Sequence, residues 1–488
     1  MSITAALREF ARRQPEAAAV SFSDSSTSWA GLDALVDRAA AYITATVPEK
    51  AGVALALPNC PAFIVLFLAI ARAGDPQWPQ ETMQKTIVDL RPALLVTATQ
   101  DSTLSIQTLT IDPGTPFPDI PRLFPDYETT VEEPDELAPF YVGFTSGSTG
   151  LPKGYRRHHR SWLRSFAGDQ KEFGLTGSDT ILALGSFTHS LFLYALIKGL
   201  NAGVHVIVYR AFQAAAIQRL LQHEAATVIY AVPSQLLLLA DAANRTGISH
   251  EKIRLILSGG AKWQAGDKRQ ITEVFPAAEF IEFYGASELS FITIAKDSEN
   301  APPASVGRPF ADVRITIRDP DGTLLPQGSI GLVFVESELR FIGYATTSRS
   351  TLRQSGNAIS VGDIGYFDKN NYLYLVGRAD RMINCSGKKI YPEEIEAALL
   401  GHSAVRAAAV FGIADQRRGQ MLVAVIAADL ASGISRSGLV QHLRTTLSSY
   451  KIPKQIGLII QWPLTASGKT DYAEIERQWQ AGKVELLT

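Results

Sequence analysis

A loop dense in glycine and hydroxyl side chains is the part of the sequence best suited to chemistry. Residues 141–154 read YVGFTSGSTGLPKG and follow a strand-like apolar run. Backbone N–H groups in such a loop can converge on an anion, hydroxyl groups add hydrogen bonds, and Lys153 adds a positive charge. Because Gly154 rather than Ser or Thr follows the lysine, this is not a Walker-type loop. The pattern predicts a phosphate-binding loop, with an ordinary surface loop as the alternative. Its candidate residues are Thr145, Ser146, Gly147, Ser148, Thr149, Gly150 and Lys153.

Three charged residues farther along the chain stand in short turns. Glu288 ends the segment FYGASE, Asp363 lies within VGDIG, and Lys469 ends PLTASGK. A carboxylate is a suitable ligand for Mg²⁺, which keeps several waters and also binds substrate phosphates. A long lysine side chain can lower the repulsion between two anions and fix their geometry. Taken alone, each of the three could equally be a solvated surface charge.

The elements that must position these residues follow an alternating pattern. Strand-like runs alternate with helical patterns over most of the chain, as at 181–184, 204–209, 228–232 and 255–258. Such alternation predicts an α/β fold, in which helices cover parallel sheets. From about 310 to 378, short alternating segments separated by turn signals indicate a small antiparallel, barrel-like β part. The remaining chain predicts a small α+β domain.

Composition excludes several classes of protein. The chain has 488 residues, enough for roughly three domains, and 46% of them are hydrophobic. With 46 Lys and Arg against 48 Asp and Glu, the net charge of −2 gives no general case for nucleic-acid binding. Two cysteines exclude a disulfide scaffold. No signal peptide or membrane span is apparent, which favours a cytoplasmic globular protein.

Five segments, in the same order, resemble the adenylate-forming superfamily of acyl-CoA synthetases, nonribosomal peptide synthetase adenylation domains and beetle luciferases. They are the loop at 143–154, the segment 283–288 with Ser287 in place of Thr, the Gly-Asp turn at 362–365, the segment 377–396, and the lysine loop at 463–469. In this superfamily a carboxylate attacks the α-phosphorus of ATP, giving an acyl-adenylate and pyrophosphate. A thiol then takes the acyl group.

The resemblance implies a role for each segment in the first half of that reaction. Loop 145–153 would hold the β- and γ-phosphates, Glu288 would bind Mg²⁺, and Asp363 would accept the ribose hydroxyls. Lys469 would act in catalysis together with Glu288 and Thr145. The implied ATP- and AMP-binding residues are those of the loop together with Gly259, Gly260, Ala261, Phe283, Tyr284, Gly285, Ala286, Ser287, Asp363 and Arg378.

The second half-reaction would use a mobile C-terminal domain. The resemblance places a hinge at Asp380, between an N-terminal adenylation domain over 1–379 and a C-terminal domain over 380–488. Rotation there would withdraw Lys469 and bring Ser386 and Gly387 towards the pantetheine arm of CoA. Lys388 would also face CoA, although a solvated basic pair with its neighbour Lys389 is an equal alternative.

The segment around the start of a helix at 190 is expected to line the acid pocket. The resemblance assigns His189, Ser190, Leu193 and Tyr194 to that pocket, whereas plain core packing is the alternative. Members that activate amino acids carry an Asp at the position of Ser190. A buried amine without a carboxylate partner would cost several kcal/mol. An apolar fatty or aryl acid is therefore predicted as the substrate.

Residues 156–160, RRHHR, form a basic run, for which a solvated face is expected. The whole pattern predicts an AMP-forming carboxylic acid–CoA ligase that uses ATP, Mg²⁺ and CoA. The alternatives are an enzyme that loads its acid onto a separate carrier protein, and an inactive nucleotide-binding module. The sequence specifies neither the acid nor the oligomeric state.

Overall fold

The structure, a computed structural model, describes the chain apart from residues 50, 75–76, 80–90, 100–105, 130, 146–152, 224–225, 261–262, 264, 346–351, 416–418, 429–432, 465–469 and 488. The side chains of 77–79, 145 and 265–267 are also left undescribed. Residue contacts divide the chain into two compact units. Unit 1 comprises Met1–Thr145, Pro152–Ile315 and Val335–Ser350, and unit 2 comprises Ser146–Leu151, Thr316–Phe334 and Thr351–Thr488. The predicted boundary of a rotating domain at 380 stays a prediction.

Unit 1 holds two sheets. In the described residues the larger one has the strand order β15 (Arg308–Pro309), β14 (Ser290–Lys296), β13 (Glu279–Ala286), β12 (Leu255–Gly259), β11 (Val228–Ala231), β9 (Thr180–Ala183), β10 (His205–Val208), β1 (Ala18–Ser21) and β2 (Ser26–Ser28). Strands β13 to β1 of this order pair in parallel. Both faces of β11 and β12 are buried, which explains their continuous apolar sequences.

The second sheet carries the predicted phosphate loop. Its order is β18 (Gly343–Tyr344), β8 (Lys153–His158), β7 (Pro139–Thr145), β4 (Gln77–Pro79), β3 (Val53–Ala56), β5 (Leu94–Thr97) and β6 (Gln107–Thr110). Strands β3, β4, β5 and β6 run parallel, whereas β7 and β8 form an antiparallel hairpin.

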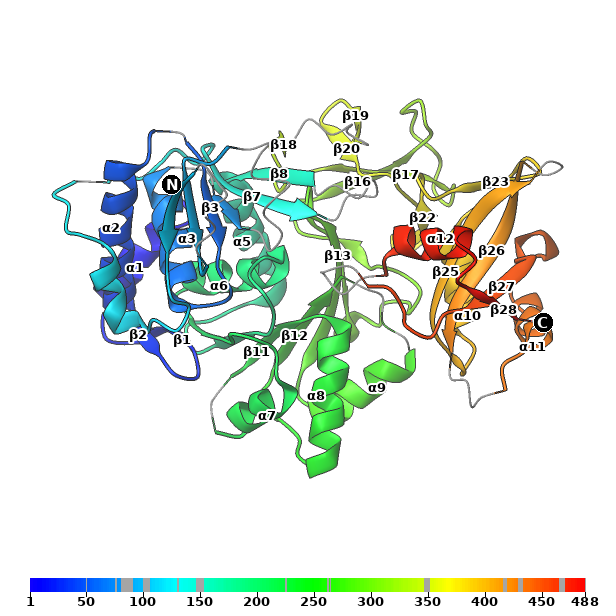
Figure 1. Cartoon of the computed structure of the whole chain (residues 1–488), viewed down its shortest axis with the longest axis horizontal. Coiled ribbons are helices and arrows are strands. Elements are labelled where there is room, and N and C mark those ends of the chain that lie inside the picture. Colours follow the sequence, from blue (N-terminus) through cyan, green and yellow to red (C-terminus); the bar gives the residue numbers. More distant parts are fainter. Residues whose placement is uncertain are drawn as a thin grey trace. The chain divides into compact units, whose positions relative to one another are not determined.

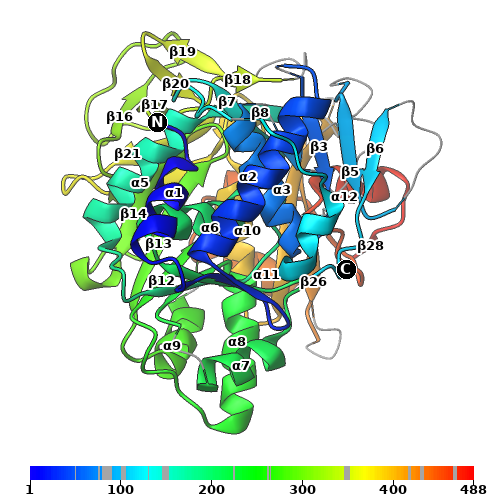
Figure 2. The same ribbon diagram turned by 90° about the vertical axis from the view of Figure 1, so that its left-hand side faces the viewer.

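Helices cover these sheets. They are α1 (Ala5–Arg13), α2 (Trp29–Thr46), α3 (Pro61–Ala73), α5 (His159–Phe173), α6 (Ser190–Ala202), α7 (Ala214–His223), α8 (Pro233–Thr246) and α9 (Ala265–Val274), with the short 3-10 segments η1 (Phe117–Leu123) and η2 (Asp297–Glu299). Helix α6 packs on β9, β10 and β11, and α3 packs on β3, β4 and β7. Figure 1 shows α7, α8 and α9 following one another beside the larger sheet. Figure 2 shows α1, α2 and α3 side by side.

Helix α3 shows how the sequence builds this interior. Pro61 opens it at the first helical position, and Gly74, with a φ of 81°, ends it. Every residue from Pro61 to Arg72 is buried, as expected of a helix that is apolar all round. The buried guanidinium of Arg72 pairs with Asp33 at 2.7 Å and with Asp37 at 2.6 Å, both on α2. Among the described residues, every helix falls short of the length and apolar character that a bilayer crossing requires.

Unit 2 contains the predicted antiparallel β part. Its strand order is β19 (Arg353–Ser355), β20 (Ala358–Ser360), β17 (Gly331–Glu336), β21 (Asp363–Phe367) and β22 (Leu373–Arg378), with β16 (Arg314–Arg318) paired to β17. Strands β21 and β22 bring Asp363 opposite Arg378. The sheet therefore fixes two of the predicted nucleotide-binding residues against each other.

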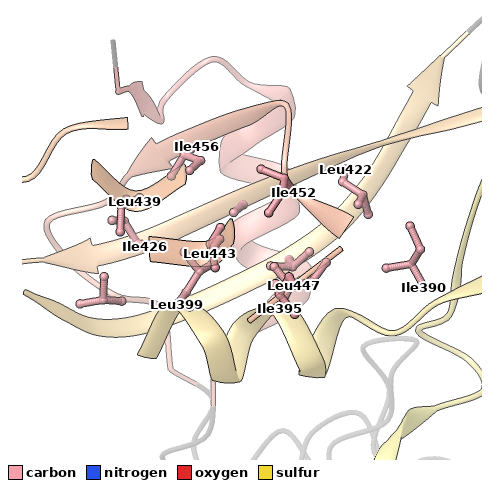
Figure 3. Packing of buried hydrophobic residues seen from close by; sticks show 14 of the residues in the cluster. Ile390, Ile395, Leu399, Leu422, Ile426, Leu439, Leu443, Leu447, Ile452 and Ile456 are labelled. Carbon is pink, nitrogen blue, oxygen red and sulfur yellow. The ribbon is translucent and has the colours of Figure 1, made fainter. Parts of the chain in front are cut away.

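The rest of unit 2 is a mixed sheet with helices on both faces. Its order is β24 (Lys388–Ile390), β23 (Ile383–Cys385), β26 (Gly419–Ala428), β27 (Gln455–Leu458) and β28 (Glu485–Leu486), with β25 (Val405–Asp415) paired to β26. On one face α10 (Pro392–Leu400) and α11 (Arg436–Arg444) cover a core that includes Leu399, Leu439 and Leu422, as Figure 3 shows. On the other face α12 (Tyr472–Gln480) buries Ile475. The 3-10 segment η4 (Ser449–Lys451) precedes β27.

Candidate active site

The predicted phosphate loop connects β7 and β8. The register of this hairpin puts Thr145 opposite Lys153, so the two ends of the loop lie side by side. Lys153 is buried, and its Nζ lies 6.0 Å from the centre of the Tyr344 ring. The structure thus places the lysine at the base of the loop. The loop residues Ser146, Gly147, Ser148, Thr149 and Gly150 lie outside the described residues, as does the side chain of Thr145.

A buried cluster of hydroxyl groups lies behind this hairpin. The Oη atoms of Tyr141 and Tyr155 are 3.1 Å apart, and hydrogen bonds join Tyr155 to the side chains of Ser190 and Ser287. Burial raises the pKa of both tyrosines, so their hydroxyls stay protonated. A Cβ at Gly143 would come within 2.2 Å of Tyr155 Oη, so this position accepts only glycine. Through these hydrogen bonds Tyr155 on β8 contacts Ser190, the first residue of α6, and Ser287, in the turn that carries Glu288.

Glu288 lies in the turn between β13 and β14, next to strand β18. Tyr344 Oη donates a hydrogen bond of 2.7 Å to Glu288 Oε1, and the backbone N–H of Phe341 donates to Glu288 O at 2.8 Å. Strand β18 pairs with β8, with Tyr344 opposite Tyr155. The fold therefore gathers Lys153, Tyr344 and Glu288 although they are far apart in sequence.

The donor set around Glu288 fits a single Mg²⁺ shared with a nucleotide. Its carboxylate is partly exposed, with one oxygen held by Tyr344. No group of three or more His, Cys, Asp or Glu residues gathers as a metal centre within the described ranges. Mg²⁺ suits one carboxylate, because it takes its other ligands from waters and substrate phosphates. Glu288 would hold the ion, and that role stays a prediction.

The predicted adenine-binding residues come from neighbouring strands. Strands β12 and β13 place Gly259 opposite Phe283, and a Cβ at Gly259 would meet that ring at 2.4 Å. Gly260 has a φ of 90°, a conformation that favours glycine. Tyr284 follows on β13 and is half-buried. The structure thus brings together Gly259, Gly260, Phe283, Tyr284, Gly285, Ala286 and Ser287, whereas Ala261 is outside the described residues.

Within unit 2, Arg378 contacts both Asp363, which is predicted to bind the ribose, and Asp380, the predicted hinge. Its Nη1 lies 3.4 Å from Asp363 Oδ1, and its Nε donates to Asp380 Oδ1 at 3.2 Å. A third bond of 2.9 Å joins Nη2 to Val361 O. Asp363 is mostly buried. These contacts fix the carboxylate of Asp363 and couple it to the residue where rotation is expected.

The predicted CoA-binding residues lie in the turn between β23 and β24. Ser386 and Gly387 both have positive φ values, 54° and 77°. The exposed Lys388 places its Nζ 3.9 Å from the centre of the Tyr450 ring, a cation–π contact. Lys469 lies outside the described residues. The ends of its loop are joined by a β-bridge between Leu464 and Thr470.

Helix α6 carries the residues predicted to line the acid pocket. His189 precedes its first residue, Ser190. Leu193 and Tyr194 are buried, at 0% and 5% exposure. Tyr194 Oη donates to Asp169 Oδ2 at 2.8 Å and lies 2.7 Å from Ser165 Oγ. Burial raises the pKa of Asp169 to about 7 despite the attraction of Lys198. Leu193 and Tyr194 thus pack in the interior, and their role as pocket wall stays a prediction.

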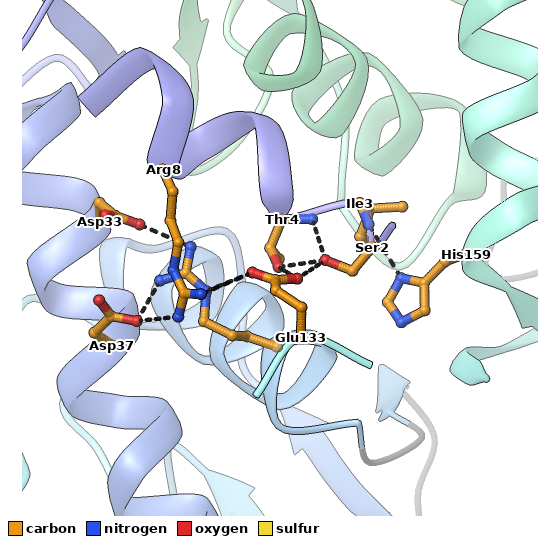
Figure 4. Close-up of polar contacts among 9 residues, drawn as sticks. Ser2, Ile3, Thr4, Arg8, Asp33, Asp37, Glu133 and His159 are labelled. Atoms are coloured by element: carbon orange, nitrogen blue, oxygen red, sulfur yellow. Dashed lines mark hydrogen bonds and ion pairs between the residues drawn. The ribbon is translucent and has the colours of Figure 1, made fainter. Parts of the chain in front are cut away.

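The basic run at 156–160 differs from the solvated face that the sequence suggests. Arg156 is exposed, but Arg157 and His159 are buried. Burial, with the nearby N-terminal amino group, lowers the pKa of His159 to about 3. Its Nδ1 accepts a hydrogen bond of 3.2 Å from the backbone N–H of Ile3, as Figure 4 shows. The expectation was wrong for these two residues because distant segments cover them.

The chain matches the models of two protein families. The model of the AMP-binding enzyme family matches residues 7–345, and that of the AMP-binding enzyme C-terminal domain matches 394–469. The chain belongs to this family. The predicted adenylate-forming superfamily is thereby confirmed, and the relatives described next bear out the predicted AMP-forming acid–CoA ligase class.

Two relatives of this AMP-binding enzyme are named as CoA ligases, and a third is named as a synthase. The uncharacterized acyl-CoA ligase YhfT of Bacillus subtilis is 34% identical over 98% of each chain. The putative long chain fatty acid-CoA ligase VraA of Staphylococcus epidermidis is 32% identical over 72% of this chain and 74% of its own. Tyrocidine synthase 3 of Brevibacillus parabrevis is 28% identical over 96% of this chain but only 8% of its own.

Solved structures show the same fold. The o-succinylbenzoate CoA synthetase MenE of Bacillus subtilis, in complex with the acyl-adenylate OSB-AMP, superposes with a TM-score of 0.84 at 24% identity, covering 96% of this chain and 97% of that one. ATP-bound MatB of Rhodopseudomonas palustris gives 0.85 at 23% identity, covering 98% and 99%. The predicted α/β fold with a smaller C-terminal domain is confirmed.

Sequence reasoning missed Tyr344 and Arg157 of this enzyme. The stretch 331–344 resembles the superfamily only loosely, so Tyr344 belongs to no motif that would have identified it. An aromatic residue directly after Gly343 was the available hint. Arg157 lies in a run of charged residues, and its burial becomes visible only through its hydrogen bonds to Ser287 O and Leu339 O.

Proposed function

We propose that this AMP-binding enzyme activates an apolar carboxylic acid with ATP and Mg²⁺ and transfers the acyl group to the thiol of CoA. The observation that carries the proposal is the gathering of Lys153, Tyr344 and Glu288 at the base of the phosphate loop. A cation there can stabilise negative charge on the phosphates of ATP, and a carboxylate can hold their Mg²⁺. The ligase names of the relatives support the same reaction.

The remaining residues would divide between the two half-reactions. Asp363, aligned by Arg378, would accept the ribose hydroxyls, and Tyr284 would lie along the adenine. Lys469 would approach the carboxylate and the α-phosphate during adenylation. Ser386 and Gly387 would later face the pantetheine arm, where the absence of a side chain at Gly387 leaves room for it.

The apolar character of the acid is supported by the residues along α6. Ser190, at the position of the ammonium-binding Asp of amino-acid-activating members, hydrogen-bonds to the neutral Tyr155. An α-ammonium group would find no carboxylate at position 190, and a buried ammonium without such a partner costs several kcal/mol. Phe192, Leu193 and Ala195 on this helix are buried and apolar. A fatty or aryl acid is therefore proposed.

Transfer to the phosphopantetheine arm of a separate carrier protein is the second candidate, favoured by the resemblance of the sequence motifs to nonribosomal peptide synthetase adenylation domains. To separate the two, the enzyme is incubated with ATP, Mg²⁺ and fatty, aryl, dicarboxylic or amino acids, with and without CoA. Mass spectrometry detects AMP, adenylate and thioester. Acyl-CoA from one apolar class is expected. Adenylate without thioester would favour the carrier protein, and an amino acid substrate would refute the proposed acid class.

A further inference from the structure

Arg157 is a buried cation whose partners are backbone carbonyls. It lies on β8 and is only 3% exposed. One guanidinium nitrogen, Nη2, donates to Ser287 O at 2.7 Å, and Nη1 donates to Leu339 O. Burial lowers the pKa of Arg157, an effect that the nearby carboxylate of Glu288 opposes. Burying a guanidinium is costly unless its donors are used, so these two contacts explain its presence.

The two carbonyls belong to the segments that carry the proposed metal ligand and its partner. Ser287 directly precedes Glu288, and Leu339 leads into the segment that ends at Tyr344. These segments also hold each other, because the N–H of Phe341 donates to Glu288 O. The N–H of Ile342 in turn donates to Arg156 O at 2.8 Å, which ties the second segment to β8.

Arg157 therefore joins three pieces of chain with one rigid group. The planar guanidinium can donate in two fixed directions, which an ammonium cannot do with the same geometry. Strand β8, on which it stands, begins with Lys153. Arg157 thus fixes the positions of Lys153, the Glu288 turn and the Tyr344 strand relative to one another.

We propose that Arg157 is a positioning residue that sets the Glu288 carboxylate and the Tyr344 hydroxyl for binding Mg²⁺ and ATP. This inference rests on the proposed function, in which Glu288 holds Mg²⁺. Arg157 itself would touch neither the nucleotide nor the ion. It would act through Ser287 O and Leu339 O.

The test uses the full chain and the variant Arg157→Met, which keeps an unbranched side chain of similar length but removes both donors. ATP binding is measured by calorimetry with and without Mg²⁺, and thermal unfolding is recorded alongside. Loss of a group that orients a metal ligand typically lowers metal affinity by about 10–100-fold. Mg²⁺ should raise the affinity of the unaltered chain for ATP. We expect this Mg²⁺-dependent increase to be about 10–100-fold smaller in Arg157→Met.

Two further variants complete the test. Arg254→Met removes another guanidinium of unit 1, whose Nη2 lies 2.6 Å from Asp179 Oδ2, and serves as a control for lowered stability. Glu288→Gln removes the proposed ligand and should abolish the Mg²⁺-dependent gain. If Arg157→Met does not fold, Arg157→Lys, which can reach only one carbonyl at a time, should show a smaller loss of the same kind.

The outcomes are distinct. If Arg157→Met or Arg157→Lys melts earlier, as Arg254→Met does, but keeps the full Mg²⁺-dependent gain, Arg157 has only a structural role and the inference is overturned. If Glu288→Gln keeps the gain, the proposed metal ligand is wrong and the inference falls with it. If the unaltered enzyme binds no ATP, the proposed function itself fails.

Discussion

At the scale of single residues, the hydrogen bond from Tyr344 to Glu288 is the contact most directly open to test. Tyr344→Phe keeps the ring beside Lys153 but removes the hydroxyl that holds Glu288 Oε1 at 2.7 Å. A hydrogen bond to a charged group contributes about 1.5–3 kcal/mol. We expect kcat/KM for MgATP in pyrophosphate exchange to fall by about 10–100-fold. Tyr366→Phe, on the β part of unit 2, is the control, and an unchanged Tyr344→Phe would contradict the arrangement.

His159 makes stability depend on pH. Its pKa is about 3 in the folded chain, below its ordinary value of 6.5, mainly because it is buried. The unfolded chain therefore binds a proton between those values and the folded chain does not. Stability is lost as the pH falls below 6.5 and continues to fall towards 3. At pH 5 the loss should be on the order of 2 kcal/mol.

The variant His159→Asn isolates this contribution. The amide oxygen can still accept from the N–H of Ile3, but it does not titrate. Melting temperatures recorded from pH 7 to pH 4.5 should fall less steeply for the variant than for the unaltered chain. Parallel curves would show that His159 is not protonated on unfolding in this range. Buried histidines elsewhere contribute equally to both curves and cancel.

At the scale of elements, Asn59 fixes the loop that leads into α6. Its Nδ2 donates to Gly185 O and Tyr209 O, both at 2.9 Å, and its Oδ1 accepts from Phe187 N at 2.8 Å. Asn59→Ala would leave these buried backbone groups without partners, at about 1–3 kcal/mol each. Because the loop continues into His189, we expect a lower melting temperature together with a higher KM for the acid.

The control for Asn59 is Gln218→Ala on α7. Gln218 is also buried, and it donates to Leu239 O at 2.9 Å and contacts His250. It should lower the melting temperature without raising the KM for the acid. An equal KM in both variants would show that the loop before α6 does not shape the acid site.

Helices and strands could be predicted from the sequence where a local pattern of apolar residues is enough to specify them. The apolar runs at 228–232 and 255–258 coincide with β11 and β12, because strands buried on both faces must be apolar throughout. For the charged run at 156–160, the local pattern predicted a solvated face, but the burial of Arg157 and His159 depends on distant segments. Arg157 is buried by Leu339, 182 residues away, and no local pattern encodes that pairing. Motif residues could be named from the sequence, but their supporting contacts needed the fold.

At the scale of the whole molecule, one chain carries the residues predicted for both half-reactions. In the predicted reaction the first half would use Lys469 with ATP and the acid, and the second would need a thiol in place of that lysine. One chain can supply both sets of groups only if part of it changes position. The predicted pivot, Asp380, follows directly after the strand that carries Arg378, and its side chain accepts a hydrogen bond from Arg378. The predicted pivot thus lies next to the residues of unit 2 that are predicted to bind the nucleotide.

Asp380→Pro should separate the two half-reactions. Proline fixes φ near −65°, which restricts rotation about this residue. Asp380→Ala is the matched control, because it removes the same contact with Arg378 but leaves the backbone free. We expect pyrophosphate exchange to continue in both variants, whereas acyl-CoA formation falls by about 100-fold in Asp380→Pro alone, the scale of loss expected when reacting groups cannot meet. Equal loss in both variants would assign the effect to the carboxylate, and wild-type thioester formation in Asp380→Pro would place the pivot elsewhere.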